Sequence, residues 1–226
     1  MLTPAQRNQL QQGTAAFGLA LPPTTLDQFA RIAELLEEGN KRLNLTRIAP
    51  EDVVTHHLID SLALAAVMTP KPGARLLDVG TGAGFPGIPL ALAYPDLRVT
   101  LLDGTRKRLA FLDEVIAEIG LKNVVTLHGR AEELAANSAH RGAYDIVAAR
   151  AVAKLERLAG WMLPLVRPGG VAVAYKSQDI DAEVAAARSS VRALSGKIER
   201  IAEVRIPGTD IVRKLVLLRK HVTVKG

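Results

Sequence analysis

The stretch LLDVGTGAGFPGIPLALAYPDLRVTLLD, residues 76–103, restricts what this 226-residue chain can fold into more than any other segment. Its first apolar run fits a buried strand, and the run from Ile88 to Ala93 fits the helix that would follow. Three glycines occupy the intervening turn: Gly80, Gly82 and Gly84. Because glycine has no Cβ atom, the chain can turn sharply and a ligand can lie against bare backbone at a helix N-terminus. The pattern predicts an α/β fold with a nucleotide-type pocket.

Two acidic residues near the turn indicate which ligand the pocket takes. Asp103 ends the second apolar run, roughly 20 residues past the first glycine, where a carboxylate accepts hydrogen bonds from ribose hydroxyls. The segment GAGFPG also matches the dinucleotide pattern, but Asp78 would repel a pyrophosphate above the turn. S-adenosylmethionine carries a sulfonium and an ammonium group instead, and the spacing of acid and glycines resembles the first motif of class I methyltransferases. An alternative role for Asp78 is to cap the next helix, and the two roles are compatible.

Strand-like and helix-like segments alternate from Arg75 onward. Strands are expected near residues 75–79, 98–102, 123–127, 144–149 and 170–175. This alternation predicts a doubly wound parallel sheet, and two extended runs joined by PGTD near the C-terminus predict a closing antiparallel hairpin. We therefore expect residues 71–226 to form a Rossmann-like, seven-stranded class I methyltransferase domain.

Residues 1–70 show no strand-like alternation and are expected to form a helical extension packed on that domain. One helix is predicted from a cap at Thr24 or Thr25 to near Gly39, and a second helical segment over residues 51–68.

Ligands of open α/β sheets bind beyond the carboxyl ends of the strands, so residues just after each strand are candidates for the site. After the third strand, Ala131 offers a small surface and a backbone N–H, and Glu132 offers an acceptor for the adenine amino group. Arg150 follows the fourth strand, where it is either a functional residue or a salt-bridged structural one.

The amino-acid composition and net charge limit the kinds of metal site, partner and cellular location that the protein can have. The chain has no cysteine, which excludes disulfides and thiolate metal sites, and we expect no metal. A net charge of +6 and a sequence pI near 9.8 favour an anionic partner, while 4% aromatic residues argue against a stacking platform for unpaired bases. The longest apolar run, Leu62 to Met68, is too short to span a bilayer, and the polar first residues do not resemble a signal peptide, so we expect a cytoplasmic protein.

The chain resembles the bacterial 16S ribosomal RNA guanine-N7 methyltransferases, also called glucose-inhibited division protein B. The resemblance rests on NLTRI, HHLIDSL, LLDVGTGAGFPGIPLA, LLDGTRKRLAFLDEV, GRAEE, ARAVAKLERL, PGG and YKS, in that order. It implies an enzyme that methylates 16S ribosomal RNA with S-adenosylmethionine. It also implies cofactor contacts at Gly80, Phe85, Ala131, Glu132 and Arg150. The chain departs from the family pattern at three positions, Gly104, Ser177 and Lys214.

Methylation of guanine N7 needs no general base, because the nitrogen already carries an exposed lone pair. His56 and His57 are the alternative catalysts, and their other expected roles are packing or RNA contact. The predicted RNA-binding residues form three groups: Lys41, Arg42 and Arg47; Arg106, Lys107 and Arg108; and Lys176. The alternative interpretation of each group is a solvated face of the protein with no role in RNA binding.

Two rival functions share parts of this pattern. A small-molecule or protein methyltransferase would use the same cofactor half, but the high pI and the family motifs argue against it. A non-enzymatic RNA-binding or cell-division protein need not keep the acids, the glycines and Arg150 together. We expect a monomer that acts on 16S ribosomal RNA or on the small ribosomal subunit.

Overall fold

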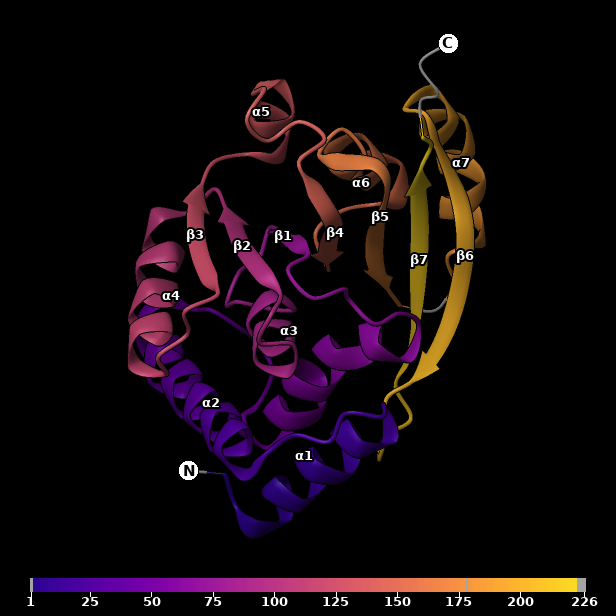
Figure 1. Ribbon diagram of the computed structural model, residues 1–226. Coiled ribbons are helices and arrows are strands. Elements are labelled where there is room, and N and C mark those ends of the chain that lie inside the picture. Colours follow the sequence, from indigo (N-terminus) through magenta and orange to yellow (C-terminus); the bar gives the residue numbers. More distant parts are fainter. Residues whose placement is uncertain (1, 178, 223–226) are drawn as a thin grey trace.

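A computed structural model describes residues 2–177 and 179–222, and these residues build one seven-stranded sheet of order β3-β2-β1-β4-β5-β7-β6 (Figure 1). The strands are β1 (Arg75–Val79), β2 (Arg98–Asp103), β3 (Val124–His128), β4 (Tyr144–Arg150), β5 (Val166–Lys176), β6 (Gly196–Arg205) and β7 (Val212–Lys220). Neighbouring strands are parallel from β3 to β5, whereas β7 is antiparallel to both β5 and β6. The predicted doubly wound sheet and closing hairpin are confirmed.

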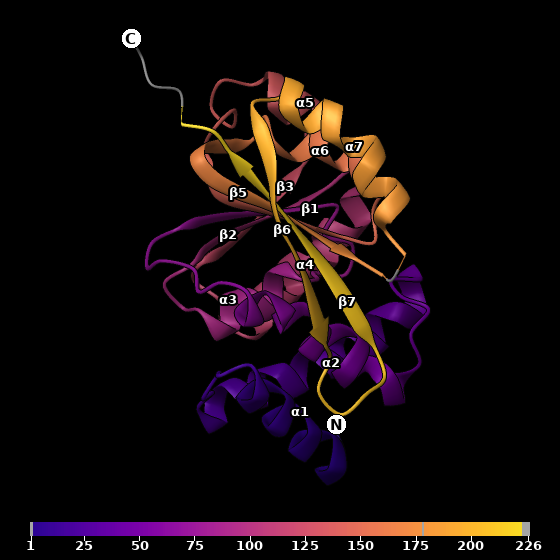
Figure 2. The same ribbon diagram turned by 90° about the vertical axis from the view of Figure 1, so that its right-hand side faces the viewer.

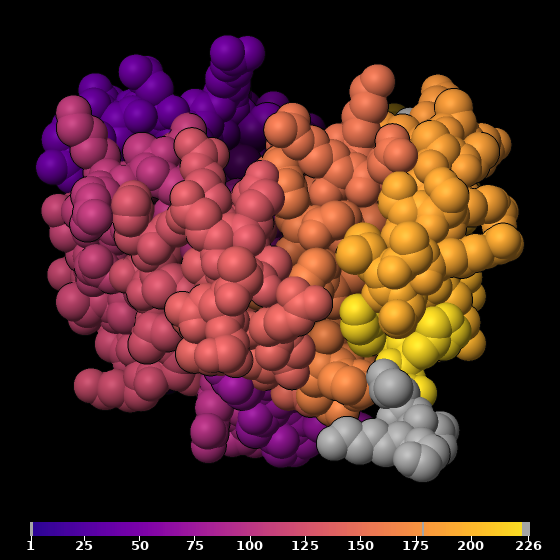
Figure 3. Space-filling model, turned by 90° about the horizontal axis from the view of Figure 1, so that it is seen from above, coloured from indigo at the N-terminus to yellow at the C-terminus, as the bar shows by residue number. Residues whose placement is uncertain are grey.

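Helices cover both faces of the sheet, as Figure 2 shows edge-on. On one face lie α1 (Pro4–Ala16), α2 (Pro23–Leu43), α3 (Gly87–Ala93) and α4 (Arg106–Glu118), and on the other α5 (Ala131–Ala136), α6 (Leu155–Met162) and α7 (Asp181–Ala193). In the space-filling view of Figure 3, the middle and C-terminal parts of the chain form most of the visible surface, and the indigo N-terminal helices lie only at its margin. No helix within residues 2–177 and 179–222 is long and apolar enough to cross a membrane.

The strand order reverses between β1 and β4, which are adjacent although two strands separate them in the chain. The turns after β1, β2, β3 and β4 consequently meet at one edge of the sheet. The turn after β1 is fastened there, because the Gly80 and Thr81 N–H groups both donate to the Leu102 carbonyl, at 2.9 and 3.0 Å. Open α/β sheets bind ligands at this kind of reversal.

The N-terminal extension is helical, as predicted, but its elements differ from those expected. Residues 51–68 do not form one α-helix: a 3₁₀ turn (Pro50–Asp52) leads into a π-helical turn (Val54–Ile59) and then a second 3₁₀ turn (Leu62–Ala66). The helix α1 was not predicted as a separate element. Its sequence signal is TPAQ, since Thr3 and Gln6 form a reciprocal capping box.

The predicted ends of α2 were wrong. The helix begins at Pro23, after Pro22 rather than after a threonine cap, because the ring of proline already has a helical φ angle at this position. It continues past Gly39 to Leu43 and ends at Asn44, whose φ of +48° is left-handed.

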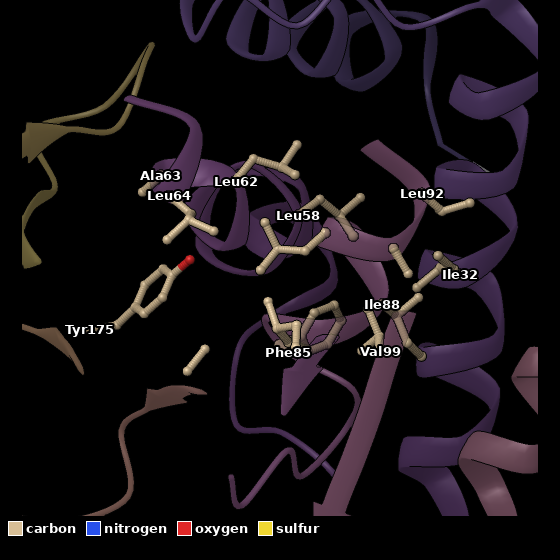
Figure 4. Close-up of a cluster of buried hydrophobic side chains, with 14 of the residues drawn as sticks. Ile32, Leu58, Leu62, Ala63, Leu64, Phe85, Ile88, Leu92, Val99 and Tyr175 are labelled. Carbon is tan, nitrogen blue, oxygen red and sulfur yellow. The ribbon is translucent and has the colours of Figure 1, made fainter. Parts of the chain in front are cut away.

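One apolar core joins the extension to the sheet. Figure 4 shows Ile32, Leu58 and Leu62 of the extension beside Phe85 and Val99 of the α/β part, and all five side chains are buried. Burial of such side chains contributes about 1.5–3 kcal/mol each relative to exposure. The extension is therefore part of the same packed body as the sheet.

Gly39 explains why α2 can lie close to α4. A Cβ atom at this position would be 2.5 Å from Cε2 of Phe111 on α4, so glycine here permits the contact. We predict that Gly39→Ala destabilises the protein by about 1–3 kcal/mol, although alanine has the higher helix propensity, because the added methyl group overpacks the core.

Gly160 in α6 is the matched control, because a Cβ atom there meets no atom within 4 Å. Gly160→Ala should stabilise the protein by about 0.5–1 kcal/mol. Urea unfolding measures both changes, and a stabilising Gly39→Ala would contradict this account of the α2–α4 contact.

Candidate functional site

The glycine turn after β1 has the backbone that the sequence predicted. Gly80, Gly82 and Gly84 have φ values of +67°, +60° and +95°, a region that other residues adopt at a cost. A Cβ atom at residue 84 would lie 2.6 Å from the Ile88 side chain, so this glycine serves packing. A Cβ atom at residue 82 would meet only a backbone oxygen at 3.9 Å, so the backbone of Gly82 is open to a ligand.

Asp78 is completely buried and caps the helix after the turn, which was the alternative role. Its Oδ2 atom accepts hydrogen bonds from the Thr81 hydroxyl at 2.7 Å and from the Gly87 N–H, at the first residue of α3, at 2.8 Å. Burial raises the pKa of Asp78 to about 6, although these two hydrogen bonds act in the opposite direction. The Oδ1 atom has no hydrogen-bond partner among the described residues. A buried acceptor without a partner suits a ligand that supplies a donor or a positive charge.

A first cleft opens beside the turn and brings together residues that follow β1, β2 and β3. Its lining is formed by Val79–Gly80, Leu102–Gly104, Gly129–Glu132, Val152 and Trp161. Four predicted cofactor residues, Gly80, Asp103, Ala131 and Glu132, are therefore neighbours in space. Val152 and Trp161 were not predicted. The position of Val152 directly after ARA was the available signal, whereas nothing in the sequence around Trp161 indicated it.

Asp103 is held rigidly at the floor of this first cleft. Its two oxygens accept hydrogen bonds from the Gly82 N–H at 3.1 Å and from the Thr105 N–H at 2.8 Å, and only 5% of the residue is exposed. A carboxylate has about four acceptor positions, so two remain for a ribose. Gly104 leaves room for Arg130, whose Nε atom is 2.8 Å from where a Cβ atom of residue 104 would lie.

Arg150 is the last residue of β4. It has both a structural and a site-lining role, on the side of the strand end away from the first cleft. Its Nη1 atom donates to Oδ2 of Asp60 at 2.8 Å and to the His56 carbonyl at 2.9 Å. Its guanidinium carbon is 5.4 Å from the centroid of the Phe85 ring, which is itself only 4% exposed. The Phe85 side chain thus packs beneath Arg150, and a cofactor contact through either residue stays a prediction.

A second cleft, of about 340 Å³, opens beside Arg150. Its lining is formed by Ile48, His56, His57, Asp60, Arg150, Ala151, Tyr175, Lys176, Ser177 and Arg213. Ala151 has a left-handed φ of +57°, a strained conformation of the kind often found at functional sites. Arg150 and Ala151 line the second cleft while Val152 lines the first, so the exit of β4 separates the two clefts.

Asp60 is a further functional-site residue that was not predicted from the sequence. It is fully buried, and its Oδ1 atom accepts a hydrogen bond from Nε of Arg213 at 2.6 Å while Oδ2 binds Arg150. The available signal was an acid inside the apolar segment HHLIDSL, since acids are rarely fully buried unless they are paired. Tyr175 fastens the same segment, because its hydroxyl donates to the Ser61 carbonyl at 2.9 Å, and Figure 4 shows this hydroxyl directed toward Leu64.

His57 is a packed and hydrogen-bonded residue. Its ring stacks on Phe85 with centroids 4.6 Å apart, its Nδ1 atom is 2.9 Å from Nη2 of Arg150, and its Nε2 atom is 2.7 Å from the Thr46 hydroxyl. Arginine can only donate, so Nδ1 must accept and the proton of the neutral ring lies on Nε2. Burial, followed by the charge of Arg150, lowers the pKa of His57 to about 3. Both nitrogens are occupied, which leaves neither free to take a proton from a substrate.

The predicted RNA-binding residues lie on different parts of the surface. Lys41 and Arg42 pair with Glu37 at 3.7 Å and Glu114 at 3.5 Å, as on a solvated helix face. Arg108 is 3.7 Å from the Asp103 carboxylate at the cofactor side.

The remaining predicted residues differ in exposure. Lys176 is largely buried and bound to Glu183 at 2.7 Å, at the edge of the second cleft. Arg47, Arg106 and Lys107 are exposed and form no ion pair within the described part of the chain. The positions that depart from the family pattern also separate: Ser177 lines the second cleft, whereas Lys214 pairs with Glu203 at 2.6 Å outside it.

Comparison with known proteins decides the family. The model of the family described as GidB, rRNA small subunit methyltransferase G, matches residues 25–212. The chain belongs to this family. The ribosomal RNA small subunit methyltransferase G of Lachnoclostridium phytofermentans is 44% identical over 210 residues, which cover 92% of this chain and 87% of the relative. That of Deinococcus radiodurans is 44% identical over 221 residues, covering 97% and 87%.

Solved structures support the fold alone. The [4+2]-cyclase SpnF has a TM-score of 0.60 at 16% identity and covers 89% of this chain and 97% of its own. TYW2 of M. jannaschii, solved in complex with AdoMet, has a TM-score of 0.52 at 16% identity, covering 66% and 68%. The predicted family, the class I methyltransferase fold and the cofactor S-adenosylmethionine are confirmed.

The site of this methyltransferase fits that cofactor. Gly82 leaves open backbone, the Oδ1 atom of Asp78 is a buried acceptor without a partner, and the first cleft contains Asp103 and Glu132. The carboxylates of Asp78, Asp103 and Glu132 are acceptors, as a ligand with a sulfonium, an ammonium and ribose hydroxyls requires. Among the described residues, no group of three or more His, Asp or Glu side chains could hold a metal ion.

The low pKa of His57 gives a direct test. NMR titration should show the His57 ring unprotonated from pH 8 to pH 5, with no inflection near 6.5. The unfolded chain binds this proton near pH 6.5 and the folded chain only near pH 3, so the contribution of His57 to stability falls as the pH is lowered between these values. A His57 inflection near 6.5 would contradict the packed, Nε2-protonated ring.

Proposed function

We propose that this methyltransferase transfers the methyl group of S-adenosylmethionine to N7 of a specific guanine in 16S ribosomal RNA. The observation that carries the proposal is the pair of clefts that share the exit of β4. The first is lined with the acceptors that a cofactor needs, and the second, of about 340 Å³, contains three cationic side chains, Arg150, Lys176 and Arg213. A base of an anionic polymer suits such a cleft, and membership in the ribosomal RNA methyltransferase G family supports the choice of RNA.

Bound S-adenosylmethionine supplies an electrophilic methyl group. The N7 lone pair forms the new bond to the methyl carbon, the carbon–sulfur bond breaks, and its electron pair stays on sulfur. The positive charge moves from sulfur to the guanine ring, and no proton has to leave first. The protein's task is to hold the base in line with the methyl group, and such positioning can contribute roughly 7–11 kcal/mol in favourable cases.

Particular residues suit these holding roles. We expect Asp103 to accept from the ribose hydroxyls and Glu132 from the adenine amino group, with Ala131 forming the wall beside the ring. Oδ1 of Asp78 is the expected acceptor for the positively charged methionine end, which would also lie against the open backbone of Gly82 and beside Gly80. Arg150 and Phe85, which pack together, would orient the reacting groups at the junction of the clefts.

We expect exposed cations to hold the RNA, and Arg47, Arg106 and Lys107 have no ion-pair partner within the described part of the chain. We expect the protein to act as a cytoplasmic monomer on 16S ribosomal RNA or on the small subunit. Support for the RNA is the family membership together with the net charge of +6.

Asp103→Ala should weaken binding of S-adenosylmethionine by about 1–3 kcal/mol, because a buried hydrogen-bond partner is left unpaired. Calorimetry measures the change. Asp113→Ala is the control, since Asp113 binds Thr126 at 2.7 Å and does not line the first cleft. Equal affinities for the wild type and Asp103→Ala would remove Asp103 from the cofactor site.

The proposed function is tested by incubating the protein with labelled S-adenosylmethionine and unmodified small-subunit RNA, free or in particles, and mapping the methyl group. We expect one guanine to be methylated at N7. In single turnovers at saturating substrates the rate should be flat between about pH 6 and 8, because no enzyme base takes part.

His56→Ala and His57→Gln should leave the shape of that profile unchanged. Transfer to another atom, or none to RNA, would refute the proposed acceptor. A rising limb near pH 6.5 that disappears in one histidine variant would instead show that this histidine is a base.

A further inference from the structure

We propose that Arg213 reads the O6 atom of the target guanine and so makes the enzyme select guanine over purines with a 6-amino group. The inference rests on the proposed function and assigns a specificity role to a residue of the second cleft. Arg213 lies on β7, and its side chain is 24% exposed. Asp60 fixes it, because the buried carboxylate accepts from Nε of Arg213 at 2.6 Å.

The chemistry of the acceptor base defines what such a reader must be. The edge of guanine that carries N7 also carries O6, and both atoms are acceptors, whereas adenine presents N7 and a 6-amino donor. N7 has to stay free to attack the methyl group, so O6 is the remaining atom on this edge for a protein contact. A group that can only donate forms a hydrogen bond with O6 of guanine. When it faces the 6-amino group of adenine, two donors meet and neither finds an acceptor.

The donors of the second cleft are not equivalent. The Nη1 atom of Arg150 already binds Asp60 and the His56 carbonyl, and its Nη2 atom binds His57. The Nζ atom of Lys176 binds Glu183 at 2.7 Å and the Ala153 carbonyl at 3.0 Å.

Two further side chains of the cleft are poor discriminators. The Ser177 hydroxyl can donate or accept, and so can the His56 ring, depending on its tautomer, so neither would reject a 6-amino group.

Arg213 is the donor-only side chain with the most unused N–H groups in this cleft. Its Nε atom is bound to Asp60, and its two terminal amino groups have no partner within residues 2–177 and 179–222. Since Asp60 is buried and itself bound to Arg150, the guanidinium is fixed before RNA arrives. The same carboxylate offsets part of the positive charge, which matters because guanine becomes cationic as the methyl group is transferred.

The test compares single-turnover methylation of RNAs that carry guanosine, inosine or 2,6-diaminopurine riboside at the mapped target position. Inosine keeps O6 and loses the 2-amino group, whereas diaminopurine carries an amino group in place of O6. We expect the wild type to methylate the guanosine RNA about 10- to 100-fold faster than the diaminopurine RNA, and the inosine RNA at close to the guanosine rate.

Arg213→Ala should reduce the guanosine-to-diaminopurine ratio to within about threefold, chiefly by slowing the guanosine RNA. Arg213→Gln is a second variant with a gain: a side-chain amide can accept from a 6-amino group, so methylation of the diaminopurine RNA should rise. Asp60 keeps Arg150 in both variants. Melting and cofactor binding verify that they fold.

Arg219→Ala is the matched control, since Arg219 also lies on β7 and binds a carboxylate, Glu199 at 2.7 Å, but does not line the second cleft. It should keep the wild-type ratio.

An unchanged ratio in both Arg213 variants, or a wild type that does not discriminate, would overturn the inference. Equal weakening for all three RNAs, with a salt dependence reduced by about one counterion, would overturn it too, because Arg213 would then bind a phosphate. If the wild type does not methylate the guanosine RNA, the proposed function itself fails, which is a separate result.

Discussion

The buried carboxylate of Asp60 is the interaction on which the rest of the site depends. It is fully buried and binds two guanidinium groups from different strands, Arg150 at the end of β4 and Arg213 on β7. Removing one member of such a buried group typically costs about 3–5 kcal/mol, because a charge is left without compensation. Together with Ile48, His56 and His57, Asp60 makes the N-terminal extension a wall of the second cleft. The extension is therefore part of the candidate site and not an appendage to the cofactor-binding sheet.

Residues 150–152, at the end of β4 and just after it, lie between the two clefts. Arg150 turns toward Asp60, and Ala151 adopts its left-handed conformation, at a cost of about 1–3 kcal/mol. Val152 then packs over Gly80, where a Cβ atom would be only 3.1 Å from it. Arg150 and the strained Ala151 thus line the second cleft, and Val152, the next residue, lines the first. This arrangement would place the reacting methyl group at the boundary, without any residue acting as a base.

Much of this could be predicted from the sequence because it depends on local patterns. The apolar runs and turn signals identified the five parallel strands and the hairpin, and the glycines and Asp103 identified the first cleft. What could not be predicted depends on distant pairings. Asp60 lies 90 residues from Arg150 and 153 from Arg213, and no local spacing links them. Gly39 was predicted to lie near a helix end. Glycine is instead needed there because the ring of Phe111, on another helix, leaves no room for a Cβ atom.

Hydrogen–deuterium exchange of Asp60→Asn tests the central claim, that the Asp60 carboxylate ties the extension to the sheet. We predict faster exchange in the helical turns of residues 54–66, because two guanidinium groups lose their common anion, while β1 and β2 keep their protection. Asp145→Asn is the control, because Asp145 accepts from the Arg75 N–H at the amino ends of β4 and β1, whereas Arg150 is at the carboxyl end of β4, and Asp145 does not line the second cleft. Unchanged exchange over residues 54–66 in Asp60→Asn would contradict the claim.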